Sequence, residues 1–206
     1  MPAPKATGLL LTAVLVLCTA ATALAFPGIP RPGLLLAAGR TFAVSGEPGD
    51  GGLSLAIAPA WPVHERARVG LALFADDMGT SLVELTDPND GTPLGTASDV
   101  HRWTYGAAWC GEYDLLQHGR WTGGASGAFG YWRIEDDVRG TTVAAGSALG
   151  LVLGATVRRD IGGSRELGFA VRFHKLTQEK SADWQRVDQY ASAALELRWA
   201  RPYGGN

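Results

Sequence analysis

Cysteine is nearly absent from this sequence, and its scarcity limits how the chain can be held together. Of the two cysteines, Cys18 lies in an N-terminal apolar segment and Cys110 lies near the middle of the chain. If the N-terminal segment is removed on export, Cys110 has no partner and the mature chain forms no internal disulfide. A secreted chain without disulfides needs another source of stability.

A transmembrane helix is missing as well. The apolar run of residues 9–16 is shorter than the roughly 20 residues that a spanning helix needs, and nothing later in the chain approaches that length. Lys5 precedes the run, and the small residues Ala-Leu-Ala follow it at 23–25. This order of a basic residue, a short apolar run and an A-x-A site predicts a secretory signal peptide, residues 1–25, cleaved after Ala25.

Charge is sparse, because only 18% of the residues are Asp, Glu, Lys or Arg. The full chain has 18 basic and 20 acidic residues, and loss of Lys5 leaves 17 against 20, a net charge of about −3. No basic patch or polybasic tail is present, so we expect no nucleic-acid partner. The 28 glycines and seven tryptophans are typical of an all-β protein, and residues 26–206 suit one domain.

Two runs near the end of the chain alternate between large apolar residues and small or polar ones. Side chains of a β-strand point to opposite faces in turn, so each run is a two-faced strand. In the run 166–174 the large face holds Leu167, Phe169, Val171 and Phe173. In the run 190–199 it holds Ala191, Ala193, Leu195, Leu197 and Trp199.

Earlier runs bring the total to about eight, an even number, as bacterial transmembrane barrels require. We expect them at residues 34–44, 53–61, 68–75, 102–115, 120–133, 143–158, 166–174 and 190–199. The connections alternate between tight ones and longer ones, of which 76–101 is the longest. In an up-and-down barrel this alternation places all tight turns at one end, which we expect to be periplasmic along with both termini.

The composition of the two faces predicts which one meets water. A soluble periplasmic lipocalin-like barrel would turn the large face inward around a ligand. Its surface would then be mostly Gly, Ala, Ser and Thr, far from the roughly 25–35% charged residues suited to water. A lipid-facing large side and a narrow lumen of small residues avoid this problem. The sequence therefore predicts a closed, up-and-down antiparallel transmembrane β-barrel, with the lipocalin-like binding barrel as an alternative.

The chain resembles the small eight-stranded outer-membrane β-barrels of Gram-negative bacteria over most of its mature length. The resemblance rests on the signal peptide, on the rhythm of strands and connections, and on Leu195-x-Leu197-x-Trp199, which is similar to the signal read by the barrel-insertion machinery. The tail 200–206 departs from the family, whose chains usually end at the aromatic residue. The resemblance implies a monomer in the outer membrane, in contact with lipid and lipopolysaccharide.

Charged residues also occur on the small, inward face. Unpaired charges in a narrow lumen are costly, whereas paired charges are tolerated. We therefore expect an ion-pair network that plugs the lumen, in a barrel with a structural or surface-interaction role and no cofactor or metal. Its members are Arg172, Glu196, Arg198, Glu166, Glu112 and Asp114.

A second, enzymatic hypothesis starts from His174, which faces inward at the expected outer end of its strand. The region resembles the lipid A 3-O-deacylases, barrels whose rim carries a His-x-Ser motif and an acidic residue on the following strand. The resemblance implies that His174 is the general base and Asp188 its orienting acid. Leu176 occupies the nucleophile position, so only Thr177, which has the opposite parity, could supply an oxygen.

Acidic residues gather in and near the connection 76–101. Their spacing matches no EF-hand loop, so we expect a solvated acidic loop rather than a metal site. They are Asp76, Asp77, Glu84, Asp87, Asp90 and Asp99.

Overall fold

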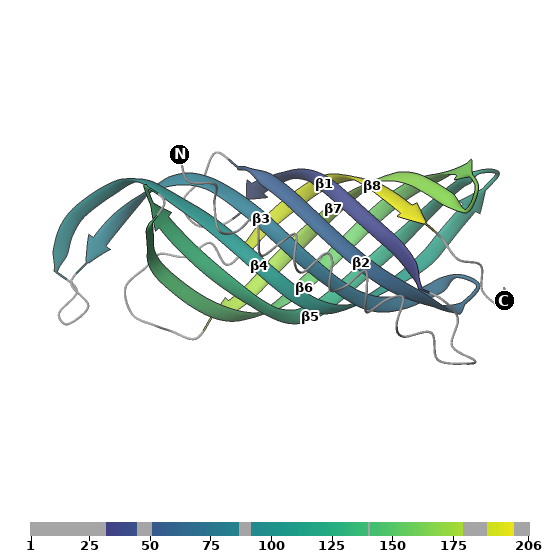
Figure 1. Ribbon diagram of the computed structural model, residues 1–206, viewed down its shortest axis with the longest axis horizontal. Coiled ribbons are helices and arrows are strands. Elements are labelled where there is room, and N and C mark those ends of the chain that lie inside the picture. The colour runs from purple at the N-terminus through teal and green to yellow at the C-terminus, as the bar shows by residue number, and fades with distance from the viewer. Residues whose placement is uncertain (1–31, 45–50, 87–91, 140, 179–188, 200–206) are drawn as a thin grey trace.

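The computed structural model describes residues 32–44, 51–86, 92–139, 141–178 and 189–199. They form one closed barrel of eight strands, each hydrogen-bonded to the next in chain order (Figure 1). No helix among the described residues is long and apolar enough to cross a membrane. The strands are β1 (Gly33–Ala43), β2 (Leu53–His64), β3 (Ala67–Thr86), β4 (Pro93–His118), β5 (Trp121–Val138), β6 (Thr141–Gly162), β7 (Arg165–Gln178) and β8 (Gln189–Trp199).

Closure comes from β1, which pairs antiparallel with β2 on one side and with β8 on the other. Leu34, for example, lies opposite Pro59 in β2 and opposite Trp199 in β8. The barrel wall therefore has no free edge where these strands meet. The predicted all-β, closed, up-and-down antiparallel barrel is confirmed. The predicted signal peptide, with its cleavage site at Ala25, lies outside the described residues.

Three two-residue turns define one end of the barrel, which we call the turn end. They connect β2 to β3, β4 to β5 and β6 to β7, and the start of β1 lies at the same end as the finish of β8. In the last turn both Gly163 and Ser164 have positive φ, at 64° and 58°. Two consecutive positive φ angles are those of a type I′ turn, which matches the twist of a hairpin.

The opposite end, which we call the hairpin end, differs from the sequence-based expectation. The connection predicted at 76–101 is mostly strand, because β3 and β4 stay paired from Ala67↔Tyr113 to Thr86↔Pro93. The pair projects beyond the rest of the barrel at the left of Figure 1. Register shifts between Asp77 and Thr80 and between Ser81 and Val83 interrupt the ladder. Such bulges also break the period-two alternation, which explains why the sequence pattern missed these strands.

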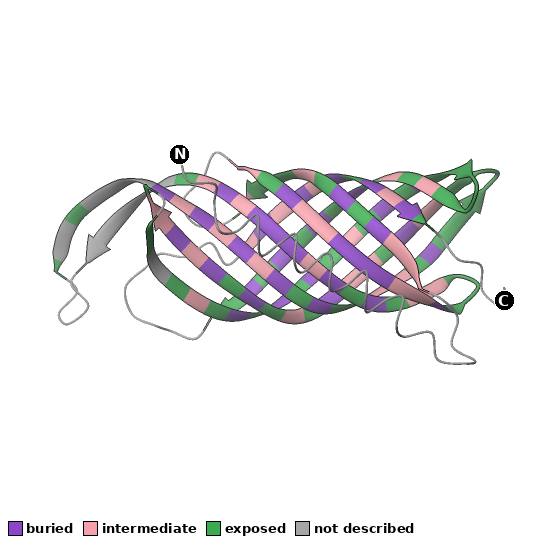
Figure 2. Cartoon of the chain, viewed as in Figure 1, coloured by how far each residue is buried: buried purple, intermediate pink, exposed green. Residues whose placement is uncertain are grey.

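Burial alternates along much of the length of the described strands, as the banding in Figure 2 shows, although the three consecutive residues 57–59 of β2 are all buried. Inward positions are often small, including Ala37, Ala72, Ala108, Ala128, Ala148, Ala170 and Ala194, all buried. Outward positions are large, apolar and exposed, including Leu36, Phe42, Trp109, Phe129, Leu151, Leu153, Phe169, Val171 and Leu195. An exposed apolar surface of this extent indicates a surface that meets lipid or a partner rather than water.

In the lumen of the barrel, a large side chain lies against glycines, which leave room for it. Trp132, from the glycine-rich β5, is fully buried and stacks on Phe74, with ring centroids 5.9 Å apart. A Cβ atom added to Gly106 or to Gly150 would overlap the indole ring. These glycines make room for a tryptophan in a narrow lumen, since close-packed interiors tolerate little extra volume.

Replacing Gly106 by alanine should therefore overpack the lumen and destabilise the barrel by about 1–3 kcal/mol. The matched control is Gly127→Ala, where the added Cβ would lie 3.8 Å from the carbonyl oxygen of Val152, in ordinary contact. We expect the control to change stability by less than about 0.5 kcal/mol. Urea unfolding in lipid vesicles, followed by tryptophan fluorescence, measures both. Equal stabilities would contradict this packing.

Candidate functional site

The lumen near the turn end contains four arginines and four carboxylates in ion pairs, which we call the ion network. Shared ion pairs link six of them, and Arg172 with Glu196 forms a separate pair; the six are Arg68, Arg158, Arg198, Glu112, Asp114 and Glu166. Arg198 donates from Nη2 to Glu112 Oε1 at 2.6 Å, and Arg68 donates from Nη1 to Asp114 Oδ2 at 3.0 Å. Arg158 pairs with Asp114 and also reaches Glu112 at 3.4 Å.

Pairing makes this burial possible. Arg158 is 1% exposed, while Glu196 is 2% exposed. An isolated charge in such surroundings costs several kcal/mol, and the cost is offset only when a partner of opposite charge is held in good geometry. Glu196 meets this condition because it pairs with Arg172 and also accepts a hydrogen bond from Thr156 Oγ1 at 3.1 Å.

The alternation of side chains along the strands predicted six charged residues in the lumen, and all six belong to the ion network. Two further members, Arg68 and Arg158, were missed. Both lie on inward positions of their strands, so extending the same parity argument to β3 and β6 would have found them. The specific pairs could not be read from parity, because they depend on how strands far apart in the chain face each other across the lumen.

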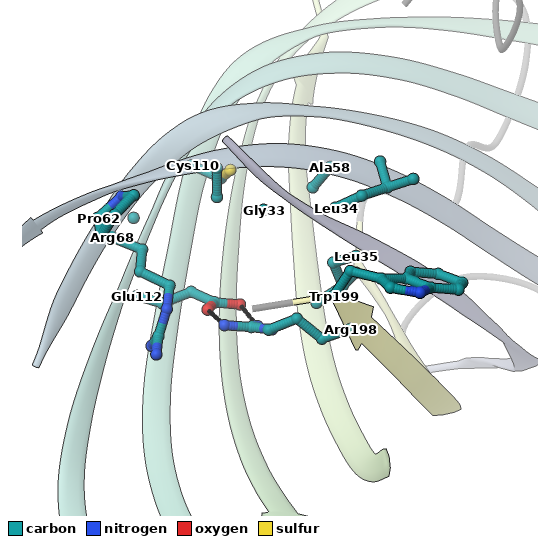
Figure 3. Close-up of a pocket in the computed structure, with 12 residues that line it drawn as sticks. Gly33, Leu34, Leu35, Ala58, Pro62, Arg68, Cys110, Glu112, Arg198 and Trp199 are labelled. Carbon is teal, nitrogen blue, oxygen red and sulfur yellow. Dashed lines mark hydrogen bonds and ion pairs between the residues drawn. The ribbon is translucent and has the colours of Figure 1, made fainter. Parts of the chain in front are cut away.

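A small hollow lies beside the ion network, close to where β1, β2 and β8 begin or end at the turn end (Figure 3). Its volume is about 20 Å³, which is room for about one water molecule. Arg68, Cys110, Glu112 and Arg198 contribute to its lining, with small residues of β1 and β2 on the other side. A hollow of this size fits no organic ligand.

A second cluster, nearer the hairpin end, is aromatic and polar. The ring of His174 stacks on Tyr190 with centroids 4.2 Å apart, and its edge meets Phe74 at 5.6 Å. Next to Phe74 lies Trp132. We call Phe74, Trp132, His174 and Tyr190 the aromatic plug. Trp132, His174 and Tyr190 are each 0% exposed, so these three side chains are shielded from solvent.

A buried carboxylate is held within the same layer. Asp76 is 0% exposed and accepts hydrogen bonds from Ser54 Oγ at 2.6 Å and from Tyr190 Oη at 2.7 Å. Charge-assisted hydrogen bonds of this kind are among the stronger ones in proteins. The expectation that Asp76 lies in a solvated acidic loop is wrong, because β3 continues past it and it faces into the lumen.

The enzymatic hypothesis placed His174 at the rim, but β7 continues to Gln178 and encloses His174 inside the barrel. Thr177 is exposed on the opposite face of the strand, and the inward position beyond His174 is taken by the buried Leu176. The candidate acid Asp188 lies outside the described residues. The described residues therefore do not bring His174 and Thr177 together.

Ser192, which the sequence did not single out, lies with its Oγ 3.2 Å from His174 Nε2, while His174 Nδ1 is 4.0 Å from Asp76 Oδ2. The order of groups is that of a Ser-His-Asp triad, but geometry alone does not give activity. Both Ser192 and His174 are at most 1% exposed. The Ser192 hydroxyl is therefore buried in this structure, and the contacts described for it are packing and hydrogen bonding.

The rim at the hairpin end carries further polar pairs. Arg102 and Asp136 form a buried bidentate pair with distances of 2.6 and 3.0 Å, and Asp77 Oδ1 lies 2.6 Å from His101 Nε2. Among the residues with described side chains, no group of three or more His, Cys, Asp or Glu is arranged to hold a metal ion.

No protein-family model and no curated protein matches the chain. Among solved structures it is similar to neisserial surface protein A, with a TM-score of 0.61, 12% sequence identity, and 81% of this chain and 95% of that chain covered. Another similar structure is Ail, the attachment invasion locus protein of Yersinia pestis, in complex with the heparin analogue sucrose octasulfate. Its TM-score is 0.47, with 10% identity over 81% of this chain and 94% of Ail.

Both structures are small eight-stranded outer-membrane β-barrels. At 12% identity, the likeness to neisserial surface protein A shows that this chain has the same fold, and the fold alone. The expected resemblance to this barrel architecture is therefore confirmed, whereas the likeness to lipid A deacylases is not shown.

Replacing one arginine of the ion network should lower the stability of the barrel far more than replacing an arginine on its outer face. In Arg158→Met, Asp114 and Glu112 lose a shared partner, and we expect the loss of about 3–5 kcal/mol of stability. The control is Arg159→Met on the next residue of β6, where the exposed guanidinium lies only 5.6 Å above the Trp121 ring. This variant should lose less than about 1 kcal/mol. Guanidinium unfolding in vesicles compares them, and similar losses would contradict a structural role for the network.

Proposed function

We propose that this chain is an outer-membrane barrel with a plugged lumen, acting through structure or through surface interactions rather than through transport or catalysis. One observation is the main support for this proposal. The lumen is occupied at two levels, by the ion network near the turn end and by the aromatic plug, whose central residues are 0% exposed, nearer the hairpin end. A pore needs a continuous polar path, and an enzyme needs a reactive group that substrate can touch.

The distribution of apolar surface supports a position in the membrane. Outward residues such as Trp109, Phe129 and Leu195 are 71%, 57% and 65% exposed. In the soluble lipocalin-like alternative these side chains would surround an internal ligand, but the interior instead holds paired charges and small residues. Because the strands close into a ring, their backbone groups are paired within the sheet, as hydrocarbon surroundings demand.

The fold shared with outer-membrane barrels also supports a location in the outer membrane, reached by export with a signal peptide cleaved after Ala25. There the apolar wall would contact lipid and lipopolysaccharide, and the barrel would be monomeric. Leu195, Leu197 and Trp199 all face outward on β8, where barrel-insertion machinery could read them during assembly. In this setting the hairpin end is the part left free to meet other molecules.

A plugged lumen predicts that the purified protein conducts no ions. Reconstituted into a planar lipid bilayer, it should give no stepwise conductance across a range of voltages, because two filled layers interrupt any aqueous path. A general porin reconstituted in the same way serves as the positive control. Stable conductance steps that rise with salt concentration would overturn the plugged-lumen proposal.

Orientation can be tested separately with single cysteines in a Cys110→Ala background. Thr92→Cys lies at the hairpin end, and Glu65→Cys lies in a two-residue turn at the turn end. On intact cells, a membrane-impermeant maleimide should label the first variant and should label the second only after lysis. The opposite pattern would place the hairpin end in the periplasm and would exclude a role at the cell surface.

A further inference from the structure

The outer face of β5 to β8 near the turn end carries two arginines between two tryptophans. Trp121 on β5 lies opposite Arg159 on β6, and Arg165 on β7 lies opposite Trp199 on β8. All four residues are exposed. Arg159 faces outward because it follows the inward Arg158 on the same strand, and successive side chains point to opposite faces. These four residues form one outward surface, which we call the Arg–Trp face.

The two arginines of this face are neighbours across the β6–β7 pair. Arg159 lies opposite Leu167, and Arg165 is two residues before Leu167 on the same face of β7. Diagonal neighbours of this kind are about 7–8 Å apart, which is within the reach of long side chains. A single chemical group bound between them could therefore meet both guanidinium groups.

Neither guanidinium group is paired with a carboxylate of the described residues. Arg159 has its Cζ atom 5.6 Å from the centre of the Trp121 ring. Arg165 donates a hydrogen bond from Nε to the carbonyl oxygen of Gly162 at 3.4 Å. These contacts hold the side chains near the surface of the barrel and leave most of their N–H groups for a ligand, because a guanidinium group has five donors.

Two acidic residues adjoin the arginines in the chain, but they do not cancel the charge. Glu166 faces the lumen, where it lies 3.4 Å from Arg158 in the ion network. Asp160 has its Oδ1 atom 2.7 Å from the backbone nitrogen of Gly162, in the turn between β6 and β7. Even with Asp160 counted, two arginines against one carboxylate give the face a net positive charge. An anionic ligand is attracted to such a surface, and a cationic one is repelled.

The surroundings of the Arg–Trp face suit the headgroup level of a lipid leaflet. Tryptophan is enriched at membrane–water interfaces, because its ring has an apolar body and a polar tip. Away from the turn end, the same side of the wall continues with Val157, Leu167 and Phe169, all exposed. A ligand with an anionic head and apolar chains could place its head between the arginines and its chains along these residues. Glycerophospholipids are built in this way.

We propose that the Arg–Trp face binds the phosphate group of an anionic glycerophospholipid from the leaflet at the turn end. Arg159 and Arg165 would donate hydrogen bonds to the phosphate oxygens, a pairing that the guanidinium geometry favours. A zwitterionic lipid would fit less well, because its cationic headgroup would lie close to the second arginine. The inference goes beyond the proposed function and rests on its membrane location.

The test uses the whole purified protein folded in detergent micelles, so it does not depend on orientation in cells. The probes are dioleoyl phosphatidylglycerol, which is anionic, and dioleoyl phosphatidylcholine, which is zwitterionic and has the same acyl chains. Native mass spectrometry measures the affinity for the first lipid that the protein retains. We expect phosphatidylglycerol to bind about tenfold more tightly. The preference should shrink as salt rises, because the two arginines are exposed.

Two variants of equal charge make the test specific. Arg159→Gln/Arg165→Gln should lower the affinity for phosphatidylglycerol about tenfold and change that for phosphatidylcholine less than about twofold. The matched control is Arg66→Gln/Arg133→Gln, since Arg66 lies in the turn between β2 and β3 and Arg133 is paired with Glu135. The control should bind phosphatidylglycerol as the unchanged protein does. Glycerol phosphate at the same concentration should displace little lipid, because it has no acyl chains.

Equal affinity for the two lipids would overturn the proposal, and so would undiminished binding of phosphatidylglycerol by the Arg159→Gln/Arg165→Gln variant. An equal loss in the control would show that overall charge attracts the lipid and that this face does not select it. Full displacement by glycerol phosphate would replace the lipid site by a site for free phosphate compounds. Migration of the unboiled barrel on a gel verifies folding. The proposed plugged barrel would stand in each case, because conductance and cysteine labelling test it separately.

Discussion

Closure of the backbone hydrogen-bond ladder is the constraint on which the rest of this structure depends. In the proposed membrane setting, an outer wall that presents Trp109, Phe129 and Leu195 to lipid would have no water beside it to satisfy N–H and C=O groups. The pairing of β1 with both β2 and β8 satisfies them inside the sheet. It also supplies stability that the described residues, which hold Cys110 as their one cysteine, cannot draw from a disulfide among themselves.

A closed ring of eight strands fixes the volume of its interior, and the inward residues follow from that volume. Alanine and glycine fill many inward positions, so larger groups at the other positions must complete the packing. Trp132 fits because Gly106 and Gly150 have no Cβ atoms. The arginines of the ion network fit because each meets a carboxylate, which turns a costly set of buried charges into a cross-link between distant strands. The same side chains that stabilise the barrel therefore occupy its lumen.

Sequence alternation was sufficient to predict the fold class, as the contrast between Phe169 and Ala170 on β7 illustrates. It was also sufficient to assign the lumen charges to one face. It failed at the hairpin end, where bulges after Asp77 interrupt the period of two. It misplaced His174, whose surroundings are set by the register His174↔Tyr190 and by Phe74 across the lumen, and neither contact leaves a local signature. Local patterns specify faces, whereas contacts across the barrel depend on pairing.

The two ends of the barrel consequently differ in how much their sequences can change without loss of stability. Residues at the turn end are committed to two-residue turns and to the ion network, so changes there act on stability first. The β3–β4 extension adds little to the barrel, and an isolated two-stranded hairpin is only marginally stable in water. It is supported at its base, where Asp77↔Trp103 and Trp103↔Glu135 tie β3, β4 and β5 into the ring. A projecting pair of strands held by a rigid base can therefore vary in sequence without disturbing the lumen.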